Sequence, residues 1–298
     1  AGAKSLVATY AGDANYNTSA STPATAHTVN PAATTTTITN AVALGTATVV
    51  GQAYPVTWTV TVNAPGTLGV AMTGNVTVSD GAATCSAAAS AGTCNLTSTT
   101  AGAKSLTATY AGDTNYLTSA SAPATAHTVN PASTTTTITN AAALATGTVI
   151  GQAYPVTWSV TVNAPGAVGA AITGNVTVSD GAATCTAAVA AGTCNLTSAS
   201  SGTKSITATY AGDANYNPSP ASTAVSHPVS PPSTTTTITN AAALGTATVV
   251  GQAYPVTWTV TVNAPGTLGA PMTGNVTVSD GVATCVALVS AGACNLTS

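Results

Sequence analysis

The chain has 298 residues, of which 45% are hydrophobic and only 3% are charged, and its formal net charge at pH 7 is −3. Three Lys and no Arg exclude a basic surface able to neutralise nucleic-acid phosphates or anionic lipids. We therefore expect no nucleic-acid binding. No apolar run approaches the roughly 20 residues of a membrane-spanning helix, so we expect no membrane insertion either.

The near absence of charge also bears on how copies of this chain meet. Mutual repulsion is weak when the net charge is close to zero, so such a surface favours association. The first residues contain neither an initiator Met nor a signal-peptide pattern, and we expect a processed product or a fragment. The surface suits an assembled or glycan-coated material better than a freely diffusing cytosolic enzyme.

Along residues 34–130 apolar and polar side chains alternate with a period of two, which is the pattern of half-buried β-strands. In "PVTWTVTV", Val56, Trp58 and Val60 fall on one face and the intervening Thr residues fall on the other. Turn sequences such as "NAPG", "SDG" and "AGD" separate these segments. In chain order, strands are predicted at 34–40, 46–50, 54–63, 75–79, 83–87, 93–98, 104–110 and 121–129.

Helices are not expected, because no segment shows a sustained helical period. The Ala-rich residues 86–92 are too short for a helix and are bounded by Gly and Ser. About seven short strands in a hundred residues, with frequent turns, predict an all-β fold of the immunoglobulin-like β-sandwich type.

The strand pattern repeats along the chain at a fixed offset of one hundred residues. "GQAYPVTWTVTVNAPG" stands at 51–66 and unchanged at 251–266, and the copy at 151–166 differs from it by one residue. "TTTTITNA" begins at 34, 134 and 234. Since the offset contains no insertion or deletion, the chain is predicted to be a tandem array of immunoglobulin-like sandwiches, arranged as beads on a string.

"SLTATYAGDTNY" at 105–116, preceded by an "AG" turn and followed by a Ser/Thr-rich strand, resembles the penultimate strand of bacterial immunoglobulin-like repeats of the group 3 type. "TTTTIT" followed by "VVGQ" is similar to the start of the same repeat. The resemblance covers the whole chain. It implies a sandwich fold and a role as a stalk, spacer or adhesive element of large bacterial surface proteins.

Pro-containing segments at 30–33, 130–133 and 230–233 are predicted to be short, semi-rigid linkers. The predicted domains are 1–31, the last strand pair of an incomplete repeat; 32–131 and 132–231, two complete repeats; and 232–298, a repeat lacking its last two strands. The two incomplete pieces together tile one domain, short only of the residues that correspond to Thr99 and Thr100.

A sandwich without its last two strands has unpaired edges and an open core, so neither incomplete piece should be stable alone. In one interpretation, the chain is a window of a longer continuous array. In the other, residues 1–30 of one chain complete residues 232–298 of the next by strand complementation, which builds a head-to-tail homopolymer. Both interpretations give a filament of immunoglobulin-like beads, and the sequence leaves them open.

The cysteines occur in pairs with one spacing, and the paired positions are Cys85/Cys94, Cys185/Cys194 and Cys285/Cys294. This pattern predicts three disulfides within domains, formed in an oxidising compartment. A closed loop of about ten residues implies roughly 2.5–3 kcal/mol of stabilisation. An intermolecular bridge is the alternative, whereas two thiolates per unit with neither a nearby His nor CxxC spacing make a poor zinc site.

The acidic residues are interpreted as turn residues. Asp80 and Asp113 lie in "SDG" and "AGD" turns, where a carboxylate can accept bonds from nearby backbone N–H groups. Copies stand at Asp13, Asp180, Asp213 and Asp280. Calcium needs six to eight oxygen ligands, so two distant Asp per unit predict no calcium site.

Aromatic and hydroxyl side chains are also given structural roles. Trp58, Trp158 and Trp258 are predicted in the core, and Tyr110 and Tyr116 are predicted to close one end of the sandwich. His27, His127 and His227 are interpreted as solvent-facing or packed at the joints. The outward Thr rows are ordinary strand surface, with glycan decoration at Thr or at N-x-S/T triplets such as those at 75 and 95 as an alternative.

No catalytic, cofactor-binding or metal site is predicted, because no nucleophile-elbow motif frames any Ser. We expect a non-enzymatic structural component of an extracellular filament or cell-surface stalk, with other copies of itself as partner. The rival hypothesis is a ligand-binding surface adhesin that recognises a glycan or a host protein. Near-identical units favour a spacer role, since the ligand-binding domain at the tip of a surface protein normally differs in sequence from the repeated domains of its stalk.

Overall fold

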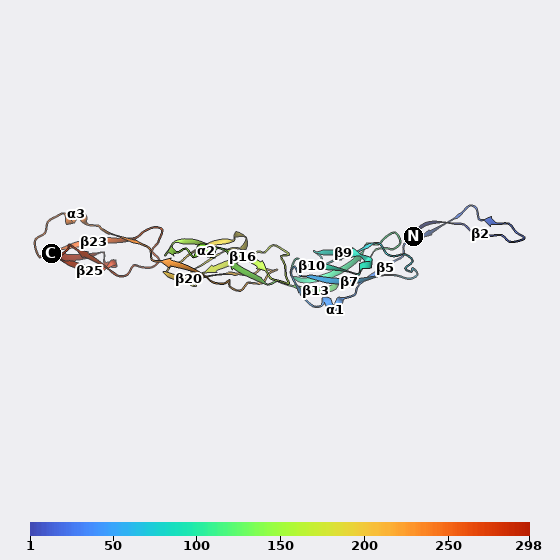
Figure 1. Cartoon of the computed structure of the whole chain (residues 1–298), viewed down its shortest axis with the longest axis horizontal. Helices are drawn as coiled ribbons and strands as arrows, with labels where there is room; N and C mark the ends of the chain where they lie inside the picture. Colours follow the sequence, from blue (N-terminus) through green and yellow to red (C-terminus); the bar gives the residue numbers. More distant parts are fainter. The chain divides into compact units, whose positions relative to one another are not determined.

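The structure is a computed structural model that describes residues 1–298, and its regular secondary structure is almost entirely β-strand (Figure 1). It divides into two compact units. The first comprises Ala1–Ser133, Val162–Ile172 and Ala214–Asn217, and the second comprises Thr134–Thr161, Thr173–Asp213 and Pro218–Ser298. Its α-helices have four residues each, and no helix is long and apolar enough to cross a membrane.

A complete copy of the repeated unit lies in residues 34–130 and consists of two sheets. One sheet has the strand order β10-β7-β5, and the other has the order β6-β13-β11-β8-β9 with β12 paired to β11. The strands are β5 (Thr34–Ile38), β6 (Thr48–Val49), β7 (Ala53–Val62), β8 (Asn75–Ser79), β9 (Thr84–Ala88), β10 (Thr93–Thr97), β11 (Gly102–Tyr110), β12 (Ser119–Ala120) and β13 (Thr125–Asn130). Two one-turn helices, α1 (Ala41–Leu44) and η1 (Ala89–Ala91), connect them.

The same elements, except for β12, recur one hundred residues later, in the sheets β14-β16-β19 and β15-β21-β20-β17-β18. These elements are β14 (Thr134–Ile138), α2 (Ala141–Leu144), β15 (Thr148–Val149), β16 (Ala153–Val162), β17 (Asn175–Ser179), β18 (Thr184–Ala188), η2 (Val189–Ala191), β19 (Thr193–Thr197), β20 (Gly202–Tyr210) and β21 (Val225–Ser230). Both copies are immunoglobulin-like β-sandwiches, as the sequence predicted.

Residues before 31 and after 232 form only parts of this pattern. The first part contains β1 (Gly2–Leu6), β2 (Thr9–Tyr10), β3 (Ser19–Ala20) and β4 (Thr25–Val29), paired as β1-β4 and β2-β3. The last part contains β22 (Thr234–Ile238), α3 (Ala241–Leu244), β23 (Ala253–Val262), β24 (Asn275–Ser279), β25 (Thr284–Leu288), η3 (Val289–Ala291) and β26 (Ala293–Thr297). Its sheets are β22-β23-β26 and β24-β25.

Residues on the inward faces of both sheets build the core of the copy at 34–130. Val56, Trp58, Val76 and Leu106 are all buried there, and Trp58 is only 3% exposed. The prediction that Trp58 packs in the core is therefore confirmed. In β5 the alternation places Thr34 and Thr36 inward, where both hydroxyls bond to Ser119, while Thr35 and Thr37 face outward.

Two sequence predictions about secondary structure were wrong. The chain forms α1 soon after β5. Three of its four residues, Ala41, Ala43 and Leu44, favour helix, and the turn brings Leu44 to the core, where it is 3% exposed. Four residues are too few to give a helical period in the sequence. The predicted strand 121–129 is interrupted as well: β13 begins only at Thr125, since Pro123 has no N–H to donate to a sheet.

Candidate functional sites

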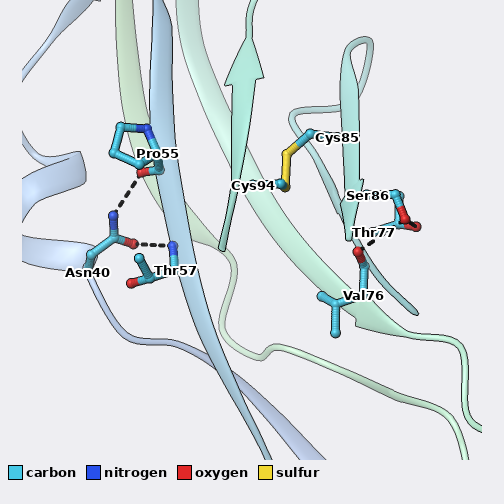
Figure 2. Close-up of a disulfide and its surroundings, with 8 residues drawn as sticks. All are labelled: Asn40, Pro55, Thr57, Val76, Thr77, Cys85, Ser86 and Cys94. Carbon is cyan, nitrogen blue, oxygen red and sulfur yellow. Dashed lines mark hydrogen bonds between the residues drawn. A yellow bond between two sulfur atoms is a disulfide. The ribbon is translucent and has the colours of Figure 1, made fainter. Parts of the chain in front are cut away.

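Each copy contains one disulfide, which joins the two sheets rather than two paired strands of one sheet. Cys85 lies on β9 at the edge of one sheet, and Cys94 lies on β10 at the edge of the other (Figure 2). Their Cα atoms are 5.9 Å apart, and the same bond links Cys185 to Cys194 and Cys285 to Cys294. No cysteine is free.

Short polar contacts hold the strands on both sides of this disulfide (Figure 2). The Asn40 amide donates to the carbonyl oxygen of Pro55 at 2.9 Å and accepts from the N–H of Thr57 at 3.0 Å. The Thr77 hydroxyl donates to Ser86 across the β8–β9 pair at 3.2 Å. These contacts tie loop to strand and strand to strand, so the bridge is set in a rigid frame.

Three buried polar side chains form a connected chain next to the core. The hydroxyl of Ser98 donates to Oδ2 of Asp80 at 2.5 Å, and the hydroxyl of Tyr54 lies 2.9 Å from that of Ser98. Oδ1 of Asp80 accepts from the N–H groups of Ala82 and Ala83 at 2.9 and 2.6 Å. The predicted turn-capping role of Asp80 is confirmed, and its second oxygen has a further role in the core.

Burial of the Asp80 carboxyl acts to raise its pKa, but the hydrogen bonds from Ser98, Ala82 and Ala83 outweigh that effect and hold the pKa below its usual value. Burial raises the pKa of the Tyr54 phenol. The cluster therefore keeps a charged carboxylate beside a neutral phenol. Tyr154, Ser198 and Asp180 repeat the same bonds in the next copy.

The histidines of the two complete copies are buried, contrary to the prediction that they face solvent or pack at the joints. His127 is 3% exposed; its Nδ1 lies 2.8 Å from the carbonyl oxygen of Leu44, and its Nε2 lies 2.8 Å from the hydroxyl of Thr48. Its ring also rests on Tyr54, with centroids 4.2 Å apart. A carbonyl can only accept, so Nδ1 must donate to Leu44. His127 therefore fastens β13 to both α1 and β6.

These side chains are closed off from solvent and bonded within the fold. The Ser98 hydroxyl is 1% exposed and donates to Asp80, and both ring nitrogens of His127 bond to other groups. The cluster satisfies buried polar groups and fixes where the last strand lies. The recurrence of Tyr and Ser at 54 and 98 in every copy was the only sequence signal that could have revealed it.

The second acidic turn is also fully used by the fold. Oδ1 of Asp113 accepts from the N–H groups of Asn115 and Tyr116, as predicted. Oδ2 accepts from Thr73 and from the phenol of Tyr110 at 3.0 Å. These hydrogen bonds, of which that from the Thr73 N–H has the largest effect, lower the pKa of Asp113 to about 2. Burial and the neighbouring Asp113 raise the pKa of the Tyr110 phenol to about 12. Both carboxylate oxygens of Asp113 thus accept hydrogen bonds from protein groups.

The predicted role of Tyr110 and Tyr116 at the end of the sandwich fits their burial. Tyr110 is fully buried, Tyr116 is 3% exposed, and the Tyr116 phenol donates to the carbonyl oxygen of Val70 at 2.6 Å. The indole N–H groups of Trp58, Trp158 and Trp258, in contrast, are buried without a hydrogen-bond partner. We have no physical account of that recurrence.

The first strand pair carries an apolar face that nothing covers. Every residue of β1 and β4 is exposed, and Leu6 is 51% and Tyr10 46% exposed. The corresponding Leu106 and Tyr110 are fully buried. The pairing itself is unchanged, since Lys4 lies opposite His27 as Lys104 lies opposite His127.

The last part of the chain has a matching depression of about 530 Å³. Leu244, Tyr254, Val278 and Asp280 are among its lining residues. The corresponding Asp80 is 8% exposed, whereas Asp280 is exposed. Residues 248–249, which correspond to β6, are not in a strand. The depression is thus the core that the last two strands cover in a complete copy.

Three solved structures are similar to this chain at low identity. Fibronectin(III)-like modules of Clostridium thermocellum CbhA are 16% identical, with 66% of this chain and 93% of that chain covered and a TM-score of 0.25. The FN1–FN3 domains of chicken CNTN1 are 9% identical, with 90% of this chain and 88% of that chain covered and a TM-score of 0.29. Three N-terminal domains of the bacteriophage RB49 outer capsid protein Hoc are 12% identical, with 85% of this chain and 78% of that chain covered and a TM-score of 0.25. TM-scores this low carry no argument about function. No curated protein matches the chain.

The family comparison, in contrast, falls on one complete copy. Residues 41–130, from α1 to the end of β13, match the model of the bacterial Ig-like domain, group 3. The match agrees with the two-sheet architecture described above and with the resemblance stated from the sequence. The family match thus identifies residues 41–130 as a bacterial Ig-like domain of group 3, and the sequence pattern of these residues recurs at the hundred-residue offset.

Proposed function

We propose that this chain is a non-enzymatic structural component of an extracellular filament or cell-surface stalk. The observation that carries the proposal is the repetition of one disulfide-braced sandwich at hundred-residue steps, with the same bonds in each complete copy. Repeating one unit lengthens the chain but gives no single unit a binding surface that the others lack. The extracellular location is supported by three disulfides, which persist in oxidising compartments.

The strand order of a complete copy suits a load-bearing element. The final strand β13 lies between β11 and β6, antiparallel to the first and parallel to the second. A pull on the end of β13 along its own direction must slide it past both neighbours, which loads their hydrogen bonds together. His127, fastened to Leu44 and Thr48, opposes the same sliding.

We further propose the division into 1–31, 32–131, 132–231 and 232–298, and assembly of copies head to tail. Residues 1–30 of one chain would complete 232–298 of the next by strand complementation. The near absence of charge supports association between copies, since their mutual repulsion is weak. Such a contact joins two different surfaces, so it propagates into an open filament.

Stretching single full-length chains tests the structural role. Two equal unfolding events per chain are expected, one for each complete copy. The chain extension gained in each unfolding event should increase by about 30 Å after reduction, because reduction releases the nine-residue segment closed by each disulfide. Unfolding at negligible force, or extension without discrete events, would contradict the stalk proposal.

A glycan array probed with the full-length chain distinguishes the adhesin alternative from the structural proposal. The structural proposal expects no glycan bound above the level of an unrelated immunoglobulin-like protein. Saturable binding to one glycan class, competed by the free glycan, would favour the adhesin.

A further inference from the structure

The strand β25 departs in sequence from its counterparts β9 and β18 in the two complete copies. The third unit has Val282, Val286 and Leu288 where the first has Ala82, Ser86 and Ala88 and the second has Ala182, Thr186 and Ala188. Each of these changes puts a larger apolar side chain in the place of a small or polar one. Three changes of one kind, in one strand and the turn before it, distinguish this unit from the other two.

The three apolar side chains are exposed to solvent. Val282 is 96%, Val286 56% and Leu288 60% exposed. The corresponding residues of both complete copies are exposed as well, and their strand is the last in its sheet, next to β8 or β17. The exposure is therefore a property of this edge of the sheet and does not depend on the strands that residues 232–298 lack. Apolar side chains exposed together on one surface mark an interaction site.

The same strand has a free backbone edge. β25 is antiparallel to β24 and pairs with no other strand, and the N–H of Val289 donates to the carbonyl oxygen of Gly274 at 2.9 Å. Because every second residue of an antiparallel strand bonds to a given neighbour, this bond shows which residues face β24. The backbone N–H and C=O groups of Thr284, Val286 and Leu288 point away from β24. The residues with exposed apolar side chains thus also have unpaired backbone groups.

Nothing in this segment protects the edge from another strand. Natural sheet edges are commonly guarded by charged side chains, by Pro or by bulges. Residues 281–298 contain neither a charged side chain nor Pro, and the β24–β25 register runs without a bulge. Two identical edges of this kind meet without charge repulsion, whereas a charged partner would meet no opposite charge. A second copy of the chain carries the same uncharged, apolar edge.

We propose that β25 is a lateral docking edge for β25 of a second copy, which pairs with it antiparallel and joins the two sheets into one. A two-fold axis through Val286 places the Val286 residues of the two copies opposite each other, and Thr284 of each copy opposite Leu288 of the other. The same surface of both copies is used, so the contact is closed and joins chains in pairs. It uses neither end of the unit and does not rest on the head-to-tail assembly proposed above.

The apolar side chains are what separates this edge from those of the other units. Backbone hydrogen bonds between two edges replace bonds to water, so their net contribution is small. Burial of apolar surface supplies the driving force. The edge strands β9 and β18 have free backbone groups too, but they carry Ser86 or Thr186 beside alanine at the outward positions. We therefore expect pairing at β25 and not at β9 or β18.

Sedimentation velocity of the full-length chain over a range of concentrations tests the proposal. The wild-type chain should form a species of twice 28.3 kDa. The double variant Val286→Thr/Leu288→Ala, which carries the residues of the second copy, should weaken this association by at least about tenfold, because it removes most of the apolar area at the contact. Val42→Ala is the matched control, because Val42 is a valine on α1 that is 95% exposed and lies away from the edge. It should associate as the wild type does.

Amide hydrogen exchange shows whether the strand edge itself forms the contact. On association, the amides of Thr284, Val286 and Leu288 should become protected. Those of Cys285 and Ala287 face β24 and should be protected already in the single chain. Unchanged protection of Cys285 and Ala287 in the double variant would show that β25 is still folded, and so distinguishes loss of binding from loss of folding.

The reciprocal change tests the edge in a complete copy. Thr186→Val/Ala188→Leu gives β18 the outward side chains of β25, and the corresponding backbone edge is already free. A chain with two such edges can join more than one partner, so species larger than a pair should appear. The amides of residues 184, 186 and 188 should then become protected in the assembled chain.

Three results would overturn the proposal. Association that Val286→Thr/Leu288→Ala leaves unchanged, with the three outward amides of β25 still exchanging freely, would place the contact on another surface. A wild-type chain that stays monomeric at every concentration would reject the second copy as the occupant. Failure of Thr186→Val/Ala188→Leu to produce larger species would reject the apolar side chains as the cause of pairing.

Discussion

At the scale of single residues, the buried side chains of Asp80, Ser98 and Tyr54 are bonded to one another or to the backbone. Asp80 accepts from two backbone N–H groups and from Ser98, and Ser98 in turn contacts Tyr54. A carboxylate can stay charged in such a place only because hydrogen bonds replace the water that it loses. The cost of breaking the cluster should therefore exceed that of an ordinary surface substitution.

Ser98→Ala should destabilise the copy at 34–130 by about 1–3 kcal/mol, since it leaves the Asp80 carboxylate and the Tyr54 phenol without their shared partner. Urea denaturation of the full-length chain, followed by Trp fluorescence, should show one copy unfolding earlier than in the wild type. The control is Ser90→Ala, an exposed hydroxyl in the same copy, which should change the midpoint little. Equal effects of the two changes would contradict the role given to the cluster.

The second acidic turn predicts how stability depends on pH. The pKa of Asp113 is about 2 in the folded chain and about 3.9 in an unfolded one. A lowered folded pKa contributes stability that is fully present above the unfolded value and is lost as the pH falls through the folded value. Thermal unfolding should therefore be steady from about pH 7 to 5 and decline between about pH 4 and 2.

Asp113→Asn separates this carboxyl from the other five. The variant should be less stable than the wild type at pH 7, because the neutral amide is a weaker acceptor for the N–H groups. It should also lose less stability between pH 5 and pH 2. A variant whose loss over that range equals that of the wild type would show that Asp113 does not contribute to the decline.

At the scale of elements, the disulfide is the covalent link between sheets that otherwise meet through side chains. Cys85 on β9 and Cys94 on β10 belong to different sheets, although η1 alone separates their strands along the chain. The bridge therefore fixes the edge at which the sheets face one another. It also leaves the opposite edge, where β6 and β13 pair, to be held by hydrogen bonds.

Reduction should cost each complete copy roughly 2.5–3 kcal/mol, the value expected for a loop closed over nine residues. Urea denaturation of reduced and alkylated chain, compared with the oxidised chain, measures this difference. Alkylation under oxidising conditions is the control, since no free cysteine is present to react. A reduced chain with an unchanged midpoint would show that packing alone holds the sheets together.

At the scale of the whole molecule, the chain stiffens its repeats with hydrogen bonds and disulfides. Both oxygens of Asp113 are filled by protein donors, and no group of three or more His, Cys, Asp or Glu side chains lies together in residues 1–298. If these contacts suffice, the stability of the repeats should not depend on a divalent cation.

Removal of calcium by a chelator should accordingly leave the denaturation midpoint of the full-length chain unchanged. The measurement is urea denaturation in excess EDTA and in millimolar calcium. A midpoint that falls in EDTA and recovers with calcium would reveal a site that the turn carboxylates do not explain.

The sequence by itself determined the fold class, the repeat and the inward face of each strand. Side chains alternate between the two faces of a strand, so Val56 and Trp58 must share one face whatever the position of the strand in the sheet. The hundred-residue repeat reproduces this arrangement in each later unit. Asp80 and Asp113 could be assigned to turns because their first bonds are local, to N–H groups two and three residues on. Local chemistry of this kind is visible in the sequence.

Only the tertiary structure decided which distant groups meet. His127 lies 83 residues from Leu44 and 79 from Thr48, and Ser98 lies 44 from Tyr54, so no local pattern could place them together. The same holds for the disulfide as a link between sheets, since its cysteines are close in sequence whatever sheets they join. Burial of a polar group depends on which strands pack over it, and strand packing is a property of the whole sandwich.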